Sequence, residues 1–198
     1  RDTDRSRGLG DVYKRQNPNR VDISEPAEGY TDTDIGYYLE LDNYATSDED
    51  NHYISMDYEN ATVTDINGET RQFVPAEYSI KNDLYSQNQI DFIDKYLNNL
   101  FKIVYEACEN GKYYKFDENY DLVDSDVTTA EEAVSNVMDI DSVRDMYILY
   151  EIVHDYDCGE GSFYMCVDLS KDSKCPKLKF TSPWDFNWAY NDLSLIHI

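Results

Sequence analysis

The chain has 198 residues, with 41 Asp and Glu against 17 Lys and Arg, and a formal net charge of −24. So acidic a chain does not bind nucleic acid or an anionic membrane surface through its overall charge, and it has no run of about 18 apolar residues that would predict membrane insertion. Acidic chains with few aromatic residues are often disordered, but the 19 Tyr, 7 Phe and 2 Trp here supply the apolar surface of a folded domain.

The two ends of the chain read as one inverted DNA element. Residues 11–16, DVYKRQ, can be encoded by GAT GTG TAT AAG AGA CAG, and the reverse complement, CTG TCT CTT ATA CAC ATC, encodes the LSLIHI of residues 193–198. We therefore interpret residues 1–16 and 193–198 as translated sequencing-adapter DNA and expect the fold to be formed by residues 17–192. The alternative is a short helix at one end and a short apolar strand at the other.

The first half of the remaining chain predicts a loop followed by strands. Residues 17–35 are polar and acidic, which is typical of a loop or linker. Partial alternation of apolar residues predicts a strand at Gly36–Asp42. Further extended segments are predicted at His52–Met56, Ala61–Ile66 and Arg71–Ile80, with a hairpin turn at Asn67-Gly68.

The clearest predicted helix starts at a capping box, Ser86–Gln89, and stops at Gly111. Its apolar residues recur at helical spacing and define one buried face. They are Ile90, Ile93, Leu97, Leu100, Phe101, Val104, Tyr105 and Cys108. Residues 112–127 are predicted to form an acidic loop. Its segment Asp117–Asp126 lacks the Gly and Glu that an EF-hand calcium loop requires, so a solvated loop is the better interpretation.

Two further helices are predicted beyond this loop. A capping box, Thr129–Glu132, begins a short helix that ends at Val137. Asp141 caps a third helix from Ser142 to about Val153, and its inner side is predicted to carry Val143, Met146, Tyr147, Tyr150 and Val153.

The chain then predicts a loop at residues 154–161 and a β-hairpin made of Ser162–Asp168 and Lys177–Phe180. The four cysteines have no CxxC spacing, which argues against a zinc site. Cys166 and Cys175 flank the hairpin turn, where they either form a disulfide under oxidising conditions or remain free thiols.

Two acidic positions flank this hairpin about thirty residues apart, and their arrangement suits phosphoryl transfer. One carboxylate orients or deprotonates the attacking hydroxyl, while another holds the Mg²⁺ that bridges the nucleotide phosphates. Asp157, in the loop before the hairpin, and Asp185, after it, have this order. The structural alternatives are that Asp157 caps a turn before Gly159 and that Asp185 is a helix N-cap.

The segment 36–190 resembles the spore-coat protein H (CotH) kinases, a family of secreted or surface-associated atypical kinases. The resemblance rests on a strand, a long helix, an Asp-rich loop at residues 154–161 (the Asp loop) and a Trp-Asp-Phe motif at Trp184–Phe186. The matching residues are Gly36–Asp42, Ser86–Tyr105, Ile140–Val143, Glu151, Asp155–Asp157, Ser162–Tyr164, Leu178–Phe180 and Pro183–Asn187.

The resemblance implies an α+β, atypical protein-kinase-like fold, with residues 36–192 forming part of the domain. An antiparallel sheet is expected beside a helical lobe that carries a small hairpin at the active site. Asp157 is implied as the catalytic carboxylate and Asp185 as the metal ligand, with Asp155 and Asn187 at cofactor-binding positions. The implied cofactors are ATP and Mg²⁺, the implied partner is a protein with Ser or Thr acceptors, and the implied location is extracellular, on the cell surface or in the spore coat.

Two residues depart from the family pattern. Asp155 stands where the family has Asn, and Asn187 replaces the last Asp of a usual Trp-Asp-Phe-Asp; a neutral amide oxygen is a poorer ligand for Mg²⁺. The departures favour an alternative function, a catalytically inactive kinase-fold module that binds a surface partner. Because the family's phosphate-contacting basic residues precede the strand Gly36–Asp42, residues 17–192 alone are expected to be inactive.

Overall fold

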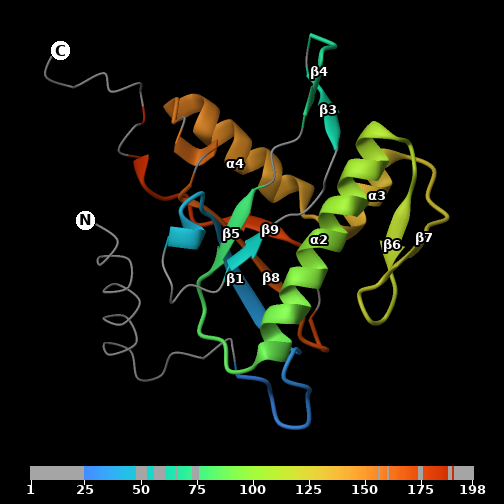
Figure 1. Ribbon diagram of the computed structural model, residues 1–198, viewed down its shortest axis with the longest axis vertical. Helices are drawn as coiled ribbons and strands as arrows, with labels where there is room; N and C mark the ends of the chain where they lie inside the picture. The colour runs from blue at the N-terminus through green and yellow to red at the C-terminus, as the bar shows by residue number, and fades with distance from the viewer. Residues whose placement is uncertain are drawn as a thin grey trace, which may run out of the picture.

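The computed structural model describes residues 25–47, 53–55, 61–65, 67–72, 76–155, 157–159, 161–173, 176–186 and 189. Both adapter-like ends lie outside these residues. The described part is a mixed α and β structure with antiparallel sheets, as predicted (Figure 1). None of its helices has the length and apolar composition needed to cross a membrane.

The largest sheet has five antiparallel strands in the order β2-β5-β1-β8-β9. The strands are β1 (Gly36–Leu41), β2 (Tyr53–Ser55), β5 (Glu77–Ile80), β8 (Phe163–Asp168) and β9 (Lys179–Thr181). Two smaller hairpins pair β3 (Thr62–Thr64) with β4 (Thr70–Gln72), and β6 (Tyr114–Phe116) with β7 (Leu122–Asp124). The helices are α2 (Gln87–Glu109), α3 (Ala130–Val137) and α4 (Ile140–Val153), with 3-10 turns η1 (Ala45–Ser47) and η2 (Asp157–Gly159).

Alternation along β1 gives the large sheet one apolar and one polar face. Tyr37 and Leu39 are fully buried on the apolar face, where they stand opposite Val167 and Met165 of β8. Helix α2 crosses this face (Figure 1) and contributes its own apolar stripe to the same core. Its buried residues are Gln89, Ile93, Tyr96, Leu97, Leu100, Ile103 and Ala107.

The C-terminal hairpin is part of this sheet, which corrects the expectation of a separate small hairpin in a helical lobe. Strand β8 pairs with β1 from Gly36↔Asp168 to Leu41↔Phe163. The pairing places the apolar residues of both strands on the same face, so the two patterns reinforce one another. The strand Gly36–Asp42 and the segment that precedes the Trp-Asp-Phe motif therefore share one rigid scaffold.

The predicted start of α2 is confirmed. Ser86 is the N-cap, and its Oγ accepts a hydrogen bond from the Gln89 amide at 3.2 Å. The same Oγ donates to Asp32 at 2.7 Å, and the Gln89 side chain donates to the Asp32 carbonyl oxygen at 2.7 Å. The described part of the predicted N-terminal loop is thus bound to the first turn of α2.

Replacing Ser86 by Ala is expected to lower the free energy of unfolding by about 0.5–2 kcal/mol, because it leaves the Gln89 amide without its acceptor. Urea denaturation of the chain measures this loss. Ser135→Ala is the control, since Ser135 lies within α3 and its hydroxyl donates only to the Glu132 carbonyl oxygen of the same helix. Equal losses for the two variants would contradict a capping role.

Helix α4 differs in two ways from its prediction. Its N-cap is Asp139, whose Oδ1 accepts from the Ser142 amide at 3.2 Å, so the helix begins two residues earlier than expected. Met146 and Tyr150 are buried as predicted, but the side chain of Tyr147 is 66% exposed. Tyr147 lies about 100° around the helix from Met146 and points away from the contact with β9.

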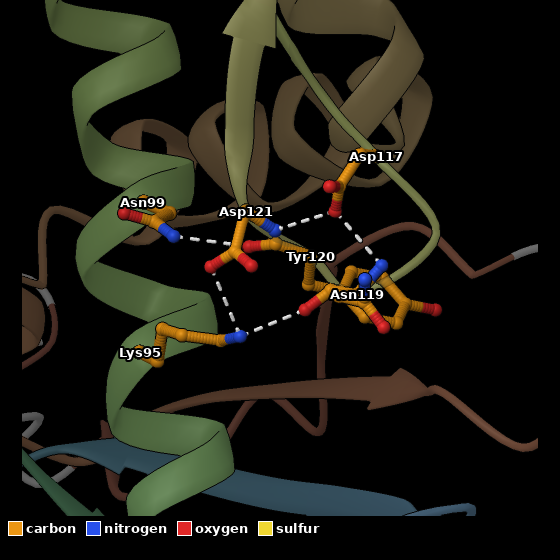
Figure 2. Close-up of polar contacts among 6 residues, drawn as sticks. All are labelled: Lys95, Asn99, Asp117, Asn119, Tyr120 and Asp121. Atoms are coloured by element: carbon orange, nitrogen blue, oxygen red, sulfur yellow. Dashed lines mark hydrogen bonds and ion pairs between the residues drawn. The ribbon is translucent and has the colours of Figure 1, made fainter.

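The predicted acidic loop at residues 112–127 is also wrong in part, because it contains the hairpin β6–β7. The Asp117 carboxylate caps its turn by accepting from the amides of Asn119 and Asp121 at 2.8 and 2.9 Å (Figure 2). From α2, the Lys95 ammonium donates to the Asn119 carbonyl oxygen at 2.8 Å and to Asp121 at 3.2 Å. The Lys95 ammonium therefore binds oxygen atoms of the acidic turn and holds the hairpin β6–β7 against α2.

Burial raises the pKa of several phenols well above the ordinary value of 10, among them Tyr37, Tyr96 and Tyr164. These groups stay protonated in the folded chain while the unfolded chain ionises near pH 10. Their contribution to stability is complete below pH 10 and is lost as the pH rises toward their folded values. We therefore expect the melting temperature to fall above pH 10, with phenolate absorbance rising at the same transition. A flat melting temperature from pH 9 to 12 would contradict these buried phenols.

Candidate functional site

The first turn of α4 is bound to the start of β9, which sets the relation between the two predicted site segments. The Asp139 amide donates to the Leu178 carbonyl oxygen at 2.9 Å, and the Phe180 amide donates to Ser142 Oγ at 3.1 Å. The Lys179 ammonium lies 3.6 Å from the Asp139 carboxylate. Two hydrogen bonds and an ion pair thus join the helix that precedes the Asp loop to the strand that precedes the Trp-Asp-Phe motif.

The Asp loop folds back on the end of α4. His154 adopts the left-handed conformation that ends the helix (φ 52°), and the Asp155 amide donates to the Tyr150 carbonyl oxygen at 3.3 Å. The thiol of Cys158 donates to the Asp155 carbonyl oxygen at 3.2 Å. Asp155 is only 5% exposed, so the predicted cofactor-binding residue is packed inside the loop. Asp157 begins the turn η2, and its side chain lies outside the described part.

The Trp-Asp-Phe segment leaves β9 through two unusual backbone conformations. Ser182 and Asp185 have φ angles of 51° and 57°, in the left-handed region that L-residues rarely adopt. Trp184 and Phe186 are 54% and 38% exposed, whereas Asp185 is half-buried. Asn187, the fourth predicted site residue, lies outside the described residues.

Tyr150 connects these two segments. Its backbone accepts the Asp155 amide, and its ring centre lies 5.6 Å from that of Phe186 and 5.5 Å from that of Phe163 in β8. The pKa of its phenol is raised first by burial, and then by Cys158 and Asp155, while the backbone of Trp184 opposes the shift. The structure therefore brings the Asp155 end of the loop and the Trp184–Phe186 segment together around one side chain.

A Mg²⁺ ion at this place would have to share its coordination with phosphate. Such an ion is held by one or two carboxylates together with phosphate oxygens and water. Asp185 is half-buried and directly precedes Phe186, whose ring packs on Tyr150, so it can supply one such carboxylate. No group of three His, Cys, Asp or Glu side chains among the described residues is arranged to hold a metal unaided, so a tight all-protein metal cage is not found there.

A second cluster, on the polar face of the sheet, was not predicted. Glu40, only 9% exposed, forms an ion pair with Lys81, whose ammonium also lies 3.8 Å from Asp42. The Ser79 hydroxyl donates to Asp42 at 2.6 Å. Alternation in the strand Gly36–Asp42 could have indicated this face. Its partners, Ser79 on β5 and Lys81 just after it, depend on a strand register that the sequence does not reveal.

Two stacked tyrosines extend this polar cluster toward the Trp-Asp-Phe segment. The rings of Tyr38 and Tyr164 lie 5.5 Å apart at an interplanar angle of 11°. Burial raises the pKa of both phenols, and Glu40 raises that of Tyr164 further. A hydrogen bond with the Ser182 side chain partly offsets the shift in the pKa of Tyr38. A continuous polar path therefore runs from Lys81 to the beginning of the segment that carries Asp185.

Two pockets among the described residues have no predicted site residue in their lining. One, of about 180 Å³, is apolar and lies among α2, β8 and β9. The other, of about 420 Å³, has a mixed lining of Cys166, Val167, Asp168, Asp172, Ser173, Lys177 and Lys179. Cys166 is a free, half-buried thiol, and Cys175, its candidate disulfide partner, lies outside the described residues.

Comparison with known proteins finds no protein-family model, no curated protein and no solved structure that matches the chain. The kinase resemblance therefore rests on the residues of the chain alone.

Proposed function

We propose that the chain is part of a CotH-like protein kinase that acts outside the cell, on its surface or in the spore coat. The kinase would transfer the γ-phosphoryl group of ATP to Ser or Thr of a protein. The observation that supports this function is the junction at Tyr150. It joins the loop that leads to Asp157 to the segment that carries Asp185, and phosphoryl transfer requires two such carboxylates in one place.

In the proposed reaction, Asp157 accepts the proton of the substrate hydroxyl as that oxygen bonds to the γ-phosphorus. The bond from the γ-phosphorus to the leaving oxygen of ADP breaks at the same stage. A bound Mg²⁺ ion would supply positive charge to offset the charge on the phosphates. Asp185 would bind this ion, and Asp155 and Asn187 would complete the nucleotide side of the site.

The direct test uses the complete protein that contains this chain, with Mg²⁺ and ATP labelled at the γ-phosphate. We expect label to appear on Ser or Thr in a peptide library that covers acidic, neutral and basic contexts. The reaction should stop when EDTA removes the metal. Absence of transfer to every peptide, and of autophosphorylation, would contradict the kinase function.

The alternative function is a catalytically inactive module with the same fold that binds a protein or carbohydrate partner. The burial of the Asp155 carboxyl group favours it, because a packed side chain contacts a nucleotide only after rearrangement. Thermal denaturation with and without Mg²⁺ and ATP separates the two functions. A ligand that binds the native state raises the melting temperature, so the kinase predicts an increase and the inactive module predicts none.

A further inference from the structure

Two buried tyrosine hydroxyls in the described structure have no acceptor for their hydrogen, those of Tyr96 and Tyr150. Proteins rarely leave a buried donor unsatisfied, because the group loses its water without a replacement. The surroundings of the two hydroxyls differ. Tyr96 is on the buried side of α2 itself, with its ring stacked 5.1 Å from Phe116 and edge-on to Tyr120 at 5.6 Å. Because it lies among apolar side chains, this hydroxyl is not a candidate for contact with a polar ligand.

The hydroxyl of Tyr150 has polar neighbours and lies in the proposed site. Asp155 and Cys158 are near enough to raise the pKa of the phenol, and the backbone of Trp184 lowers it by donating toward the phenol oxygen. No acceptor for the hydroxyl hydrogen lies within hydrogen-bond distance among the described residues. Phe186, which packs on the Tyr150 ring, is 38% exposed. A modest movement of the segment 182–186 would therefore open the hydroxyl to a ligand.

The same segment carries the two left-handed residues, Ser182 and Asp185. Such conformations are unfavourable by about 1–2 kcal/mol for residues other than glycine, and they concentrate at ligand sites and switch regions. An unsatisfied donor and a strained backbone thus occur at one place, and both are relieved if a ligand reorganises the segment.

We propose that the Tyr150 hydroxyl donates a hydrogen bond to a phosphate oxygen of the bound nucleotide. The proposal rests on the proposed kinase function and adds a ligand contact that the sequence did not indicate. A phenol is a neutral donor. Unlike the side chain of Lys or Arg, it would not be drawn into an ion pair with the Asp155 carboxylate and stays free to donate to a phosphate. Tyr150 would then bind the nucleotide with its hydroxyl while its backbone and ring hold the Asp loop and the Trp-Asp-Phe segment.

Tyr150→Phe tests the contact, and Tyr96→Phe is the matched control because it removes the other unsatisfied hydroxyl. The affinity of the complete protein for Mg²⁺·ADP is measured by calorimetry, and the melting temperature is measured without nucleotide. We expect both variants to melt at or above the wild-type temperature, since each loses an unsatisfied buried donor. Only Tyr150→Phe should bind the nucleotide more weakly, by roughly tenfold or more, as expected for a hydrogen bond to a charged oxygen.

Equal affinity of Tyr150→Phe and wild type would overturn the contact while leaving the kinase function intact. A weaker affinity accompanied by a lower melting temperature without nucleotide would also overturn it, because the hydroxyl would then serve the fold. If the wild-type protein binds no Mg²⁺·ADP, both the contact and the proposed function are wrong.

Discussion

Replacing Asp157 by Ala in the complete protein is expected to lower kcat for phosphoryl transfer by about a hundredfold to ten-thousandfold. The reason is that Asp157 is the group proposed to accept the proton of the substrate hydroxyl, and Ala cannot accept it. Because Asp157 is proposed to act on the hydroxyl and not on the nucleotide, the Kd for Mg²⁺·ADP should change little. Asp185→Ala should instead weaken binding of the metal nucleotide, so the two variants separate the two carboxylate roles.

Asp124→Ala is the matched control, because Asp124 is an exposed carboxylate on β7 of the remote hairpin. It removes the same charge and should leave kcat unchanged. Phosphoryl transfer by Asp157→Ala at the wild-type rate would refute the catalytic assignment. In that case Asp157 would be a turn residue before Gly159, as its local sequence also permits.

The second large effect concerns the core beneath α2. Ile93→Ala is expected to lower the free energy of unfolding by about 2–5 kcal/mol, because Ile93 is completely buried against the apolar face of the sheet. Ile152→Ala makes the same chemical change on α4, where the side chain is 65% exposed. Its effect should stay within about 0.5 kcal/mol.

Urea denaturation of the two variants measures the difference directly. Both substitutions exchange Ile for Ala within a helix, so the change in helix propensity is shared and the difference reports burial. Similar losses of stability would mean that α2 does not cover the sheet as described.

The elements predicted best are those whose signals are local. The capping boxes at Ser86 and Thr129 are confirmed at the N-termini of α2 and α3, and Gly68 has the positive φ of the predicted hairpin turn. Each depends on contacts within a few residues, which a sequence pattern can carry.

The features that were missed depend on contacts between distant segments. The hairpin β6–β7 has short polar strands, and it is held by Lys95 from α2 (Figure 2). Tyr147 fits a helical stripe, yet the side of α4 that packs is decided by the anchoring of the helix to β9. The sequence of residues 112–127 does not show the contact with Lys95, and the sequence of α4 does not show the contact with β9.

The candidate site divides in the same way. The order of Asp157 and Asp185 around a hairpin could be read from the sequence, and the proposed chemistry follows from that order. Their connection through Tyr150 could not, because it needs the ring of Tyr150 to meet Phe186, thirty-six positions further along the chain. The ion pair of Glu40 with Lys81 was missed because it depends on the pairing of β1 with β5.

We propose that the Asp loop and the Trp-Asp-Phe segment form one nucleotide and metal site. Iron-mediated cleavage shows which segments lie at the bound ion, with ATP and Fe²⁺ in place of Mg²⁺ and with ascorbate and peroxide to generate hydroxyl radicals there. We predict ATP-dependent backbone cleavage at both residues 155–157 and residues 184–186. Cleavage at only one of these segments, or only elsewhere in the complete protein, would contradict the claim.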